Sequence, residues 1–155
     1  MDAEEFTEDE NHQILRIIAE AKDDLYVDEY QVYFELECKQ ELDKDGQEIG
    51  ASVSVDTQYL TVSITFYPKS VRVFRGNIEV FRQCVYHELA HVIIDPLHKL
   101  FAKFLDGKDI TVVEDYLIDE KWESAVERVS RIAYILRRET NRLNNLKAKM
   151  KEIIG

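Results

Sequence analysis

The chain has 155 residues, of which 45% are hydrophobic, and its formal net charge is −11 at pH 7. This length suits one domain that buries its own core, so we expect a single domain over residues 1–155. The acidic balance argues against binding of nucleic acid through phosphate contacts, and no apolar run approaches the length that crosses a bilayer. Because the first residues are acidic where a secretory signal would be basic and then apolar, we expect a cytoplasmic protein.

The first half of the chain predicts one helix followed by three strands. An amphipathic helix is expected over about 11–26, where apolar side chains recur at helical spacing: Ile14, Ile17, Ile18 and Ala21. Three segments rich in β-branched and aromatic residues are predicted strands: Tyr30 to Cys38, Ile49 to Val55 and Tyr59 to Tyr67. Asp45 and Gly46 form a hairpin-turn dipeptide between the first two strands, and residues 56–58 connect the second tightly to the third. These short connections predict a three-stranded antiparallel sheet.

The third strand is expected to end at Pro68, and a helix is predicted to begin after it at Asn77. The Asn77 side chain is well placed to cap this helix. The helix is expected to end near Asp95, because Pro96 cannot continue it. Its predicted buried stripe consists of Phe81, Val85, Leu89 and Val92.

Two further helices are predicted in the last third of the chain. A short one is expected over 97–104, ended by Asp106 and Gly107, and a long one from about Val113 to Ile153. In the long helix only Glu139 interrupts the apolar stripe, and the last turns pack on the domain or on another subunit. The predicted fold class is therefore α+β, with the three-stranded antiparallel sheet packed against the two long helices.

The segment His87-Glu88-Leu89-Ala90-His91 predicts a metal site. Residues at i and i+4 share one helix face, so His87 and His91 can bind a single zinc ion from the same side. Two imidazoles and the carboxylate of Glu88 would be costly in so apolar a segment without partners. With one more protein ligand and a water, the ion would form an open, catalytic site in which Glu88 acts as general base.

The third ligand has three candidates. His98 lies beyond Pro96 and is expected to be exposed or to support another ligand. Glu123 follows an apolar Trp122, so it projects from the edge of the stripe and can face the two histidines. Glu127 lies one turn further along the same edge. The cysteines, Cys38 and Cys84, match no zinc-ribbon or redox spacing and are expected to be buried thiols.

Residues 86–97, together with 122–128, resemble the gluzincin-type zinc metallopeptidases. The similarity extends over roughly 30–135 and is to the metallopeptidases of phages and prophages and to the minimal minigluzincins. It implies zinc bound by His87, His91 and Glu123, Glu88 as general base, and peptide-bond hydrolysis in the cytoplasm, which is the host cytoplasm for a phage-encoded protein. Larger gluzincins have an aspartate at the position of Glu127, which leaves open whether Glu127 supports His87 or is itself the ligand.

Other functions and partners follow from the same residues. Peptide deformylases share the histidine motif, but Cys38 lacks the surroundings of their cysteine ligand. The alternative outside enzymes is a metal-stabilised, phage-type interaction protein without proteolysis, acting through the long helix, which also offers a surface for self-association. For the enzyme we expect a peptide or protein substrate, bound along an edge of the sheet. Candidates for stabilising the oxyanion are Tyr116, Tyr134 and His98.

Overall fold

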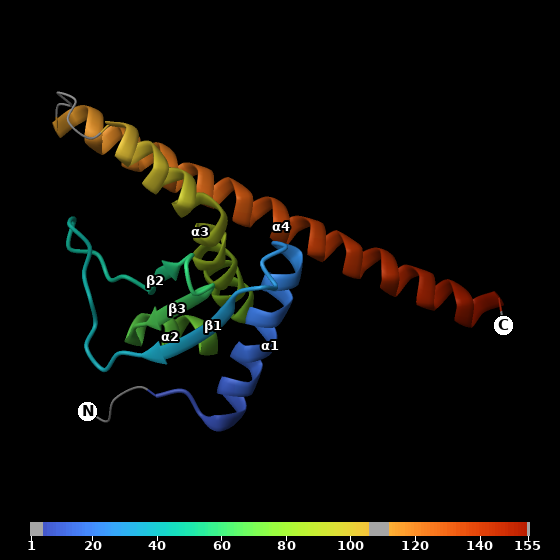
Figure 1. Cartoon of the computed structure of the whole chain (residues 1–155). Helices are drawn as coiled ribbons and strands as arrows, with labels where there is room; N and C mark the ends of the chain where they lie inside the picture. The colour runs from blue at the N-terminus through green and yellow to red at the C-terminus, as the bar shows by residue number, and fades with distance from the viewer. Residues whose placement is uncertain (1–4, 106–111, 155) are drawn as a thin grey trace.

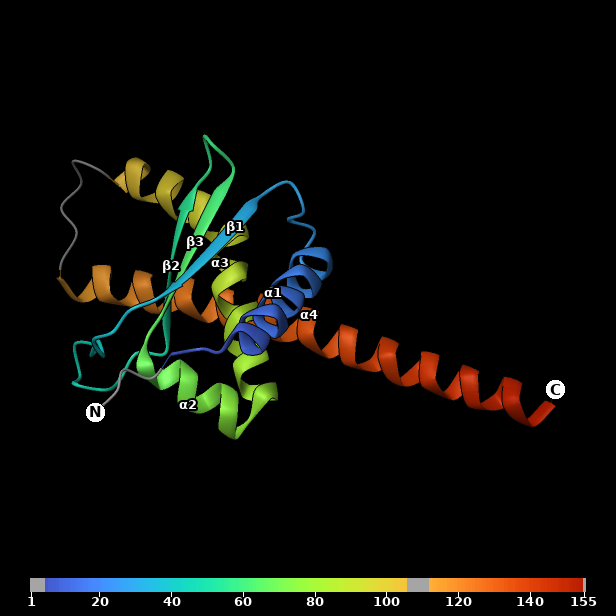
Figure 2. The same cartoon turned by 90° about the horizontal axis from the view of Figure 1, so that it is seen from below.

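The structure is a computed structural model that describes residues 5–105 and 112–154. Within these residues the chain forms four helices and three strands. In chain order they are α1 (Glu8–Asp24), β1 (Gln31–Leu36), β2 (Ala51–Asp56), β3 (Thr61–Phe66), α2 (Pro68–Gly76), α3 (Ile78–Leu105) and α4 (Val112–Ile154). Helix α3 is the central element, because it packs against α1, α2, α4 and β2 (Figures 1 and 2). The predicted α+β fold class is confirmed.

Helix α1 begins with a capping box. The Thr7 hydroxyl accepts a hydrogen bond from the Glu10 backbone at 3.2 Å, and the Glu10 carboxylate accepts one from the Thr7 backbone at 2.8 Å. This cap starts the helix three residues earlier than predicted. The predicted apolar side chains of α1 are all buried in the main core, where they pack among residues of the strands and of α3.

The sheet is mixed, with strand order β1-β3-β2, so the prediction of an entirely antiparallel sheet is wrong. β2 runs antiparallel to β3, whereas β1 runs parallel to β3, with Gln31 opposite Thr61. The turn at Gly46 exists, with φ at +78°, but it closes only an isolated bridge between Leu42 and Glu48. This turn lies within the connection from β1 to β2. That connection is long enough to place β2 on the opposite side of β3 from β1.

Proline has two effects that differ from the prediction. Pro68 does follow β3, but it is also the first residue of α2, where its fixed φ and missing N–H cost nothing. Pro96 lies inside α3 and does not end it. Figure 1 shows that α3 changes direction between its green first part and its yellow second part, the bend expected from an interior proline. The predicted short helix over 97–104 is therefore the second part of α3, and its predicted stop at 106–107 lies outside the described residues.

Two other features of the second half agree with the sequence. The Asn77 side chain caps α3 by accepting a hydrogen bond from the backbone of Glu79 at 3.1 Å. The four residues of the predicted α3 stripe are buried in the main core. Of the two cysteines, Cys38 is exposed and Cys84 is half-buried, so the prediction of two buried thiols is wrong for Cys38. No helix in the described part of the chain combines the length and apolarity needed to cross a membrane.

Candidate metal centre

The two histidines of the motif lie on the side of α3 that faces α4. Phe81, Val85 and Leu89 bury one face of α3 against the sheet and α1, which turns the neighbouring face toward α4. The imidazoles of His87 and His91 lie there one turn apart, with ring centroids 5.4 Å apart and an interplanar angle of 77°. Both rings are therefore fixed by helix geometry before any ligand from another element is considered.

Glu123 is brought to the histidines by the packing of α4 on α3. Val126, 1% exposed, packs with Ala90 and Ile94 of α3 in a small second core. One turn before it, the Glu123 carboxylate lies 2.8 Å from Nε2 of His87 and 3.9 Å from Nε2 of His91. Each of the three side chains offers one ligand atom, and these atoms lie within 4.8 Å of one another. His87, His91 and Glu123 thus form a group that could hold a metal ion.

The outer nitrogens of the two imidazoles also contact carboxylates. Nδ1 of His87 lies 3.3 Å from Glu127, and Nδ1 of His91 lies 2.9 Å from Asp95. A carboxylate on the second nitrogen fixes the tautomer of a ligating histidine and raises its basicity. Glu127 therefore lies where a carboxylate can support His87, on the ring nitrogen away from Glu123.

His98 lies apart from this group. Its ring stacks on Trp122 at 5.3 Å, and its Nε2 is 3.5 Å from Asp119. It borders the same groove as the other two histidines but contacts neither. Among the candidate oxyanion donors, Tyr134 donates a hydrogen bond to Glu79 at 2.6 Å, and the side chain of Tyr116 lies outside the described residues.

The charges of His87 and Glu123 depend strongly on each other. The hydrogen bond with Glu123 raises the pKa of His87 to about 9, and the same bond lowers the pKa of Glu123. Glu88 is 9% exposed, and its burial raises its pKa, although the neighbouring His87 and His91 act in the opposite direction. A buried carboxyl group with a raised pKa accepts a proton more readily than an ordinary glutamate does.

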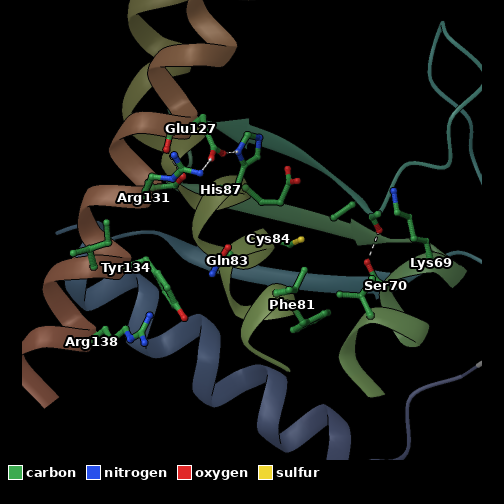
Figure 3. A pocket seen from close by; sticks show the side chains of 17 residues that line it. Lys69, Ser70, Phe81, Gln83, Cys84, His87, Glu127, Arg131, Tyr134 and Arg138 are labelled. Carbon is green, nitrogen blue, oxygen red and sulfur yellow. Dashed lines mark hydrogen bonds and ion pairs between the residues drawn. The ribbon is translucent and has the colours of Figure 1, made fainter. Parts of the chain in front are cut away.

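Three cavities border residues of this group, and two of them reach Glu88. The first, a groove of about 550 Å³, lies between β2 on one side and α3 and α4 on the other, and it borders His87, Glu88, His91 and Glu123. The second, of about 620 Å³, borders His87 and Glu88 and extends along α3 past Cys84 to Phe81 (Figure 3). Glu88 therefore lies at the junction of both cavities, with access to a molecule bound in either.

No protein-family model, curated protein or solved structure gives a significant match to the chain. The interpretation of the centre therefore depends on its own geometry. Sequence reasoning did not identify Asp95 as a partner of the centre, because Asp95 was interpreted only as the end of a helix before Pro96. Its position four residues after His91 places both side chains on one helix face, and that spacing was the available signal.

Proposed function

We propose that the protein is a zinc-dependent metallopeptidase. The observation that carries this proposal is the convergence of His87, His91 and Glu123, with a buried glutamate, Glu88, beside the group and outside it. Two imidazole nitrogens, one carboxylate oxygen and a water are the ligand set of open, catalytic zinc sites. The gluzincin-type resemblance of the sequence assigns the same residues to the same roles.

The chain's own residues divide the work between them. When bound, zinc would polarise the scissile carbonyl and lower the pKa of a coordinated water. Glu88 would take the proton of that water and pass it to the leaving amine. Glu127 and Asp95 would hold the two imidazoles in one tautomer and orientation.

The substrate is proposed to bind as an extended peptide along β2. Within the described residues β2 is an edge strand that pairs with β3 alone. Residues 51–53 of β2 line the groove that borders the metal group, so main-chain hydrogen bonds to this strand would hold a peptide beside Glu88. If proline substitutions along the free edge of β2 left cleavage unchanged, the segment from Pro96 to Asp119 would be the better candidate for substrate binding.

Glu88→Gln tests the proposed chemistry. The amide keeps the size of the side chain but cannot accept the proton, so cleavage of a peptide library should fall by roughly 10²–10⁴-fold. Zinc content, measured by elemental analysis, should stay near one equivalent, because Glu88 is not a ligand. Glu120→Gln, an exposed glutamate of α4, is the matched control. Equal cleavage by Glu88→Gln and Glu120→Gln would contradict the proposal.

A second candidate function is binding of a partner protein through the end of α4. Figure 1 shows this red end projecting from the body, and Leu143, Leu146 and Met150 are exposed along it. Residues 137–155 carry six basic and two acidic side chains, so two copies paired along this stretch would bring like charges together. An amphipathic helix with acidic flanks would fit it better than self-association. Sedimentation of the protein alone, over a range of concentrations, distinguishes the two cases, and Glu88→Gln would affect neither.

A further inference from the structure

A series of polar contacts joins three helices beside the metal group. Tyr86, the residue before His87 on α3, is 0% exposed, and its hydroxyl donates a hydrogen bond to Oδ2 of Asp24 at 2.5 Å. Oδ1 of Asp24 lies 3.4 Å from Nη1 of Arg137 on α4. Asp24 is the last residue of α1, which packs on both α3 and α4 (Figure 1). Its carboxylate therefore connects three helices, and Tyr86, Asp24 and Arg137 are here called the anchor.

Asp24 is in a costly place for a carboxylate. The C-terminal end of a helix carries partial negative charge, so an acidic side chain in the last turn of α1 is destabilising by itself. The side chain of Asp24 is 14% exposed, so little water is left to stabilise its charge. An asparagine would accept the hydrogen bond from Tyr86 without this cost. The contact that requires a negative charge here is therefore the one with Arg137 on α4.

The anchor fixes α4 on α3 at a second place along their contact. The first place is the small core around Val126, close to Glu123. At the second place the ring of Tyr134 meets the ring of Tyr86 edge to face, with centroids 5.7 Å apart and an interplanar angle of 82°. Arg137 follows Tyr134 by about one turn, roughly 16 Å along the helix from Val126. A single contact would let α4 rotate about it, whereas two separated contacts set both its rotation and its sliding on α3.

We propose that Tyr86, Asp24 and Arg137 are positioning residues for the metal group. The two histidines are on α3 and Glu123 is on α4, so the three ligand atoms meet only at one relative position of these helices. The 2.8 Å contact between Glu123 and Nε2 of His87 depends on that position. The anchor holds the two helices there without itself supplying a ligand atom. This inference rests on the proposed zinc site.

Glu20 offers a matched control for Asp24. It lies one turn earlier on α1 and forms its ion pair with Arg82 of α3, whereas the ion pair of Asp24 is with α4. Asp24→Asn and Glu20→Gln each remove one charge from α1 and keep the size of the side chain. Asp24→Asn should weaken zinc binding by roughly 3–30-fold, at most about the effect of losing a side chain that contacts a ligand. Glu20→Gln should bind zinc as the parent protein does, and competition with a chromophoric chelator measures both affinities.

Arg137 variants test the anchor from α4. The side chain of Arg137 is 29% exposed, so its replacement leaves the core intact and the protein should fold. Arg137→Ala should weaken zinc binding about as much as Asp24→Asn does, and Arg137→Lys, which keeps the charge beside Asp24, should restore most of the affinity. Arg142→Ala, an exposed arginine further along α4, should leave the affinity unchanged.

The double variant Asp24→Asn, Arg137→Ala shows whether the two residues act together. Because both substitutions break the same contact, the double variant should lose no more zinc affinity than either single variant. Losses that simply add would mean that Asp24 and Arg137 act separately, and they would overturn the anchor as a unit.

The single tryptophan of the chain reports the position of α4 in zinc-free protein. Trp122 precedes Glu123, and its ring lies 5.3 Å from that of His98 and 6.0 Å from that of Phe101, both on α3. A shift of α4 on α3 would change the exposure of this ring. Acrylamide should therefore quench its fluorescence more strongly in Arg137→Ala than in the parent protein, although the two positions are about 22 Å apart along the helix. The control on α1 should be quenched as the parent protein is.

These measurements distinguish positioning of the metal group from a contribution to stability alone. Urea unfolding should show that Asp24→Asn and Glu20→Gln both lose some stability, because each breaks an ion pair between helices. Equal losses of stability, with zinc affinity and quenching of Trp122 as in the parent protein for both variants, would overturn the inference.

The outcomes also separate the anchor from the proposed function. A parent protein that bound no zinc would contradict the metallopeptidase and the positioning of its zinc site together. A parent protein that bound zinc and cleaved peptides, with anchor variants that bound zinc equally well, would support the metallopeptidase and overturn the anchor alone.

Discussion

The two ends of α4 share one sequence pattern but have opposite surroundings. Apolar side chains recur at alternating steps of three and four along the helix, except at Glu139. In the first part Val126 is 1% exposed and Ala133 is 8% exposed, although Ile132 and Leu136 are 60% and 63% exposed. In the last part Leu146 is 50% and Met150 is 59% exposed. The periodicity therefore predicts the helix, but burial depends on what lies opposite. Helix α3 lies opposite the first part of α4, whereas no described element covers the stripe of the last part.

This difference decides where the functional side chains can lie. Glu123 and Glu127 are on the packed part of α4, where the packing of Val126 against α3 fixes their distance from the histidines. Glu139, further along α4, forms an ion pair with Arg142 of its own helix, at 3.8 Å. Three glutamates on one helix thus have different roles because only two of them face a packed neighbour.

The largest effect is expected from a charge in the packed part of α4. Val126→Asp buries a carboxylate among Ala90 and Ile94, and we expect a loss of about 3 kcal/mol or more in the free energy of unfolding. Leu146→Asp places the same charge on the projecting part and should change stability by less than about 0.5 kcal/mol. Urea unfolding followed by circular dichroism measures both. Equal losses would show that the two parts of α4 are packed alike.

The second comparison is between carboxylates that differ only in position along α4. Glu123→Ala removes a proposed zinc ligand, whereas Glu127→Ala removes only the support of His87 and should weaken zinc binding by about 10–100-fold. Competition with a chromophoric chelator measures the affinity. Glu139→Ala is the control and should bind zinc as the parent protein does. Full retention of zinc in Glu123→Ala, with loss in Glu127→Ala, would exchange the two roles.

The members of the metal group could be predicted from sequence because each has a local signal, although the packing of α4 on α3 is what brings Glu123 to the histidines. His87 and His91 lie one turn apart on a single helix, and Glu123 lies beside an apolar residue at the edge of a periodic stripe. Helix periodicity predicts the histidine pair and places Glu123 and Glu127 on one edge of a helix, whereas the preference for Glu123 came from the gluzincin resemblance. The support of His91 by Asp95 is equally local, and it was missed because Pro96 was expected to end the helix.

The errors in the fold concern choices that local sequence leaves open. Pro68 is compatible with the start of a helix, and Pro96 is compatible with a bend inside one. Contacts with neighbouring elements decide between these outcomes and the end of a helix. The turn at Gly46 was identified correctly, but whether β1 pairs with β2 or with β3 depends on contacts between distant residues. Local signals predicted most of the elements but missed α2 and divided α3 in two, and they predicted the pairing of the strands poorly.

A third prediction concerns ion pairs in packed and projecting regions. The hydrogen bond from the Arg75 side chain, together with the one from the Thr7 backbone, lowers the pKa of Glu10 from 4.5 to about 2. A lowered folded pKa means that the stabilisation is present above about pH 4.5 and is lost as the pH falls toward 2. Since the Arg75 side chain is 46% exposed, we expect about 1 kcal/mol at pH 7 after solvent screening. Glu10→Gln should lower stability by this amount at pH 7 and by little near pH 2, whereas Glu139→Gln should have no measurable effect at either pH.

The smallest effect is expected from removing the projecting part of α4. A protein ending at residue 140 keeps Arg137, which lies 3.4 Å from Asp24 of α1, and keeps every side chain of the metal group and of the cavity of about 620 Å³ that borders Glu88. The residues removed are exposed wherever their side chains are described, so the free energy of unfolding should change by less than about 0.5 kcal/mol and zinc affinity should not change. Urea unfolding at several protein concentrations gives the measurement. A loss above about 1 kcal/mol that grows with protein concentration would mean that the projecting stripe is covered by a second copy in the parent protein. A loss of that size without concentration dependence would mean that the stripe packs on its own domain.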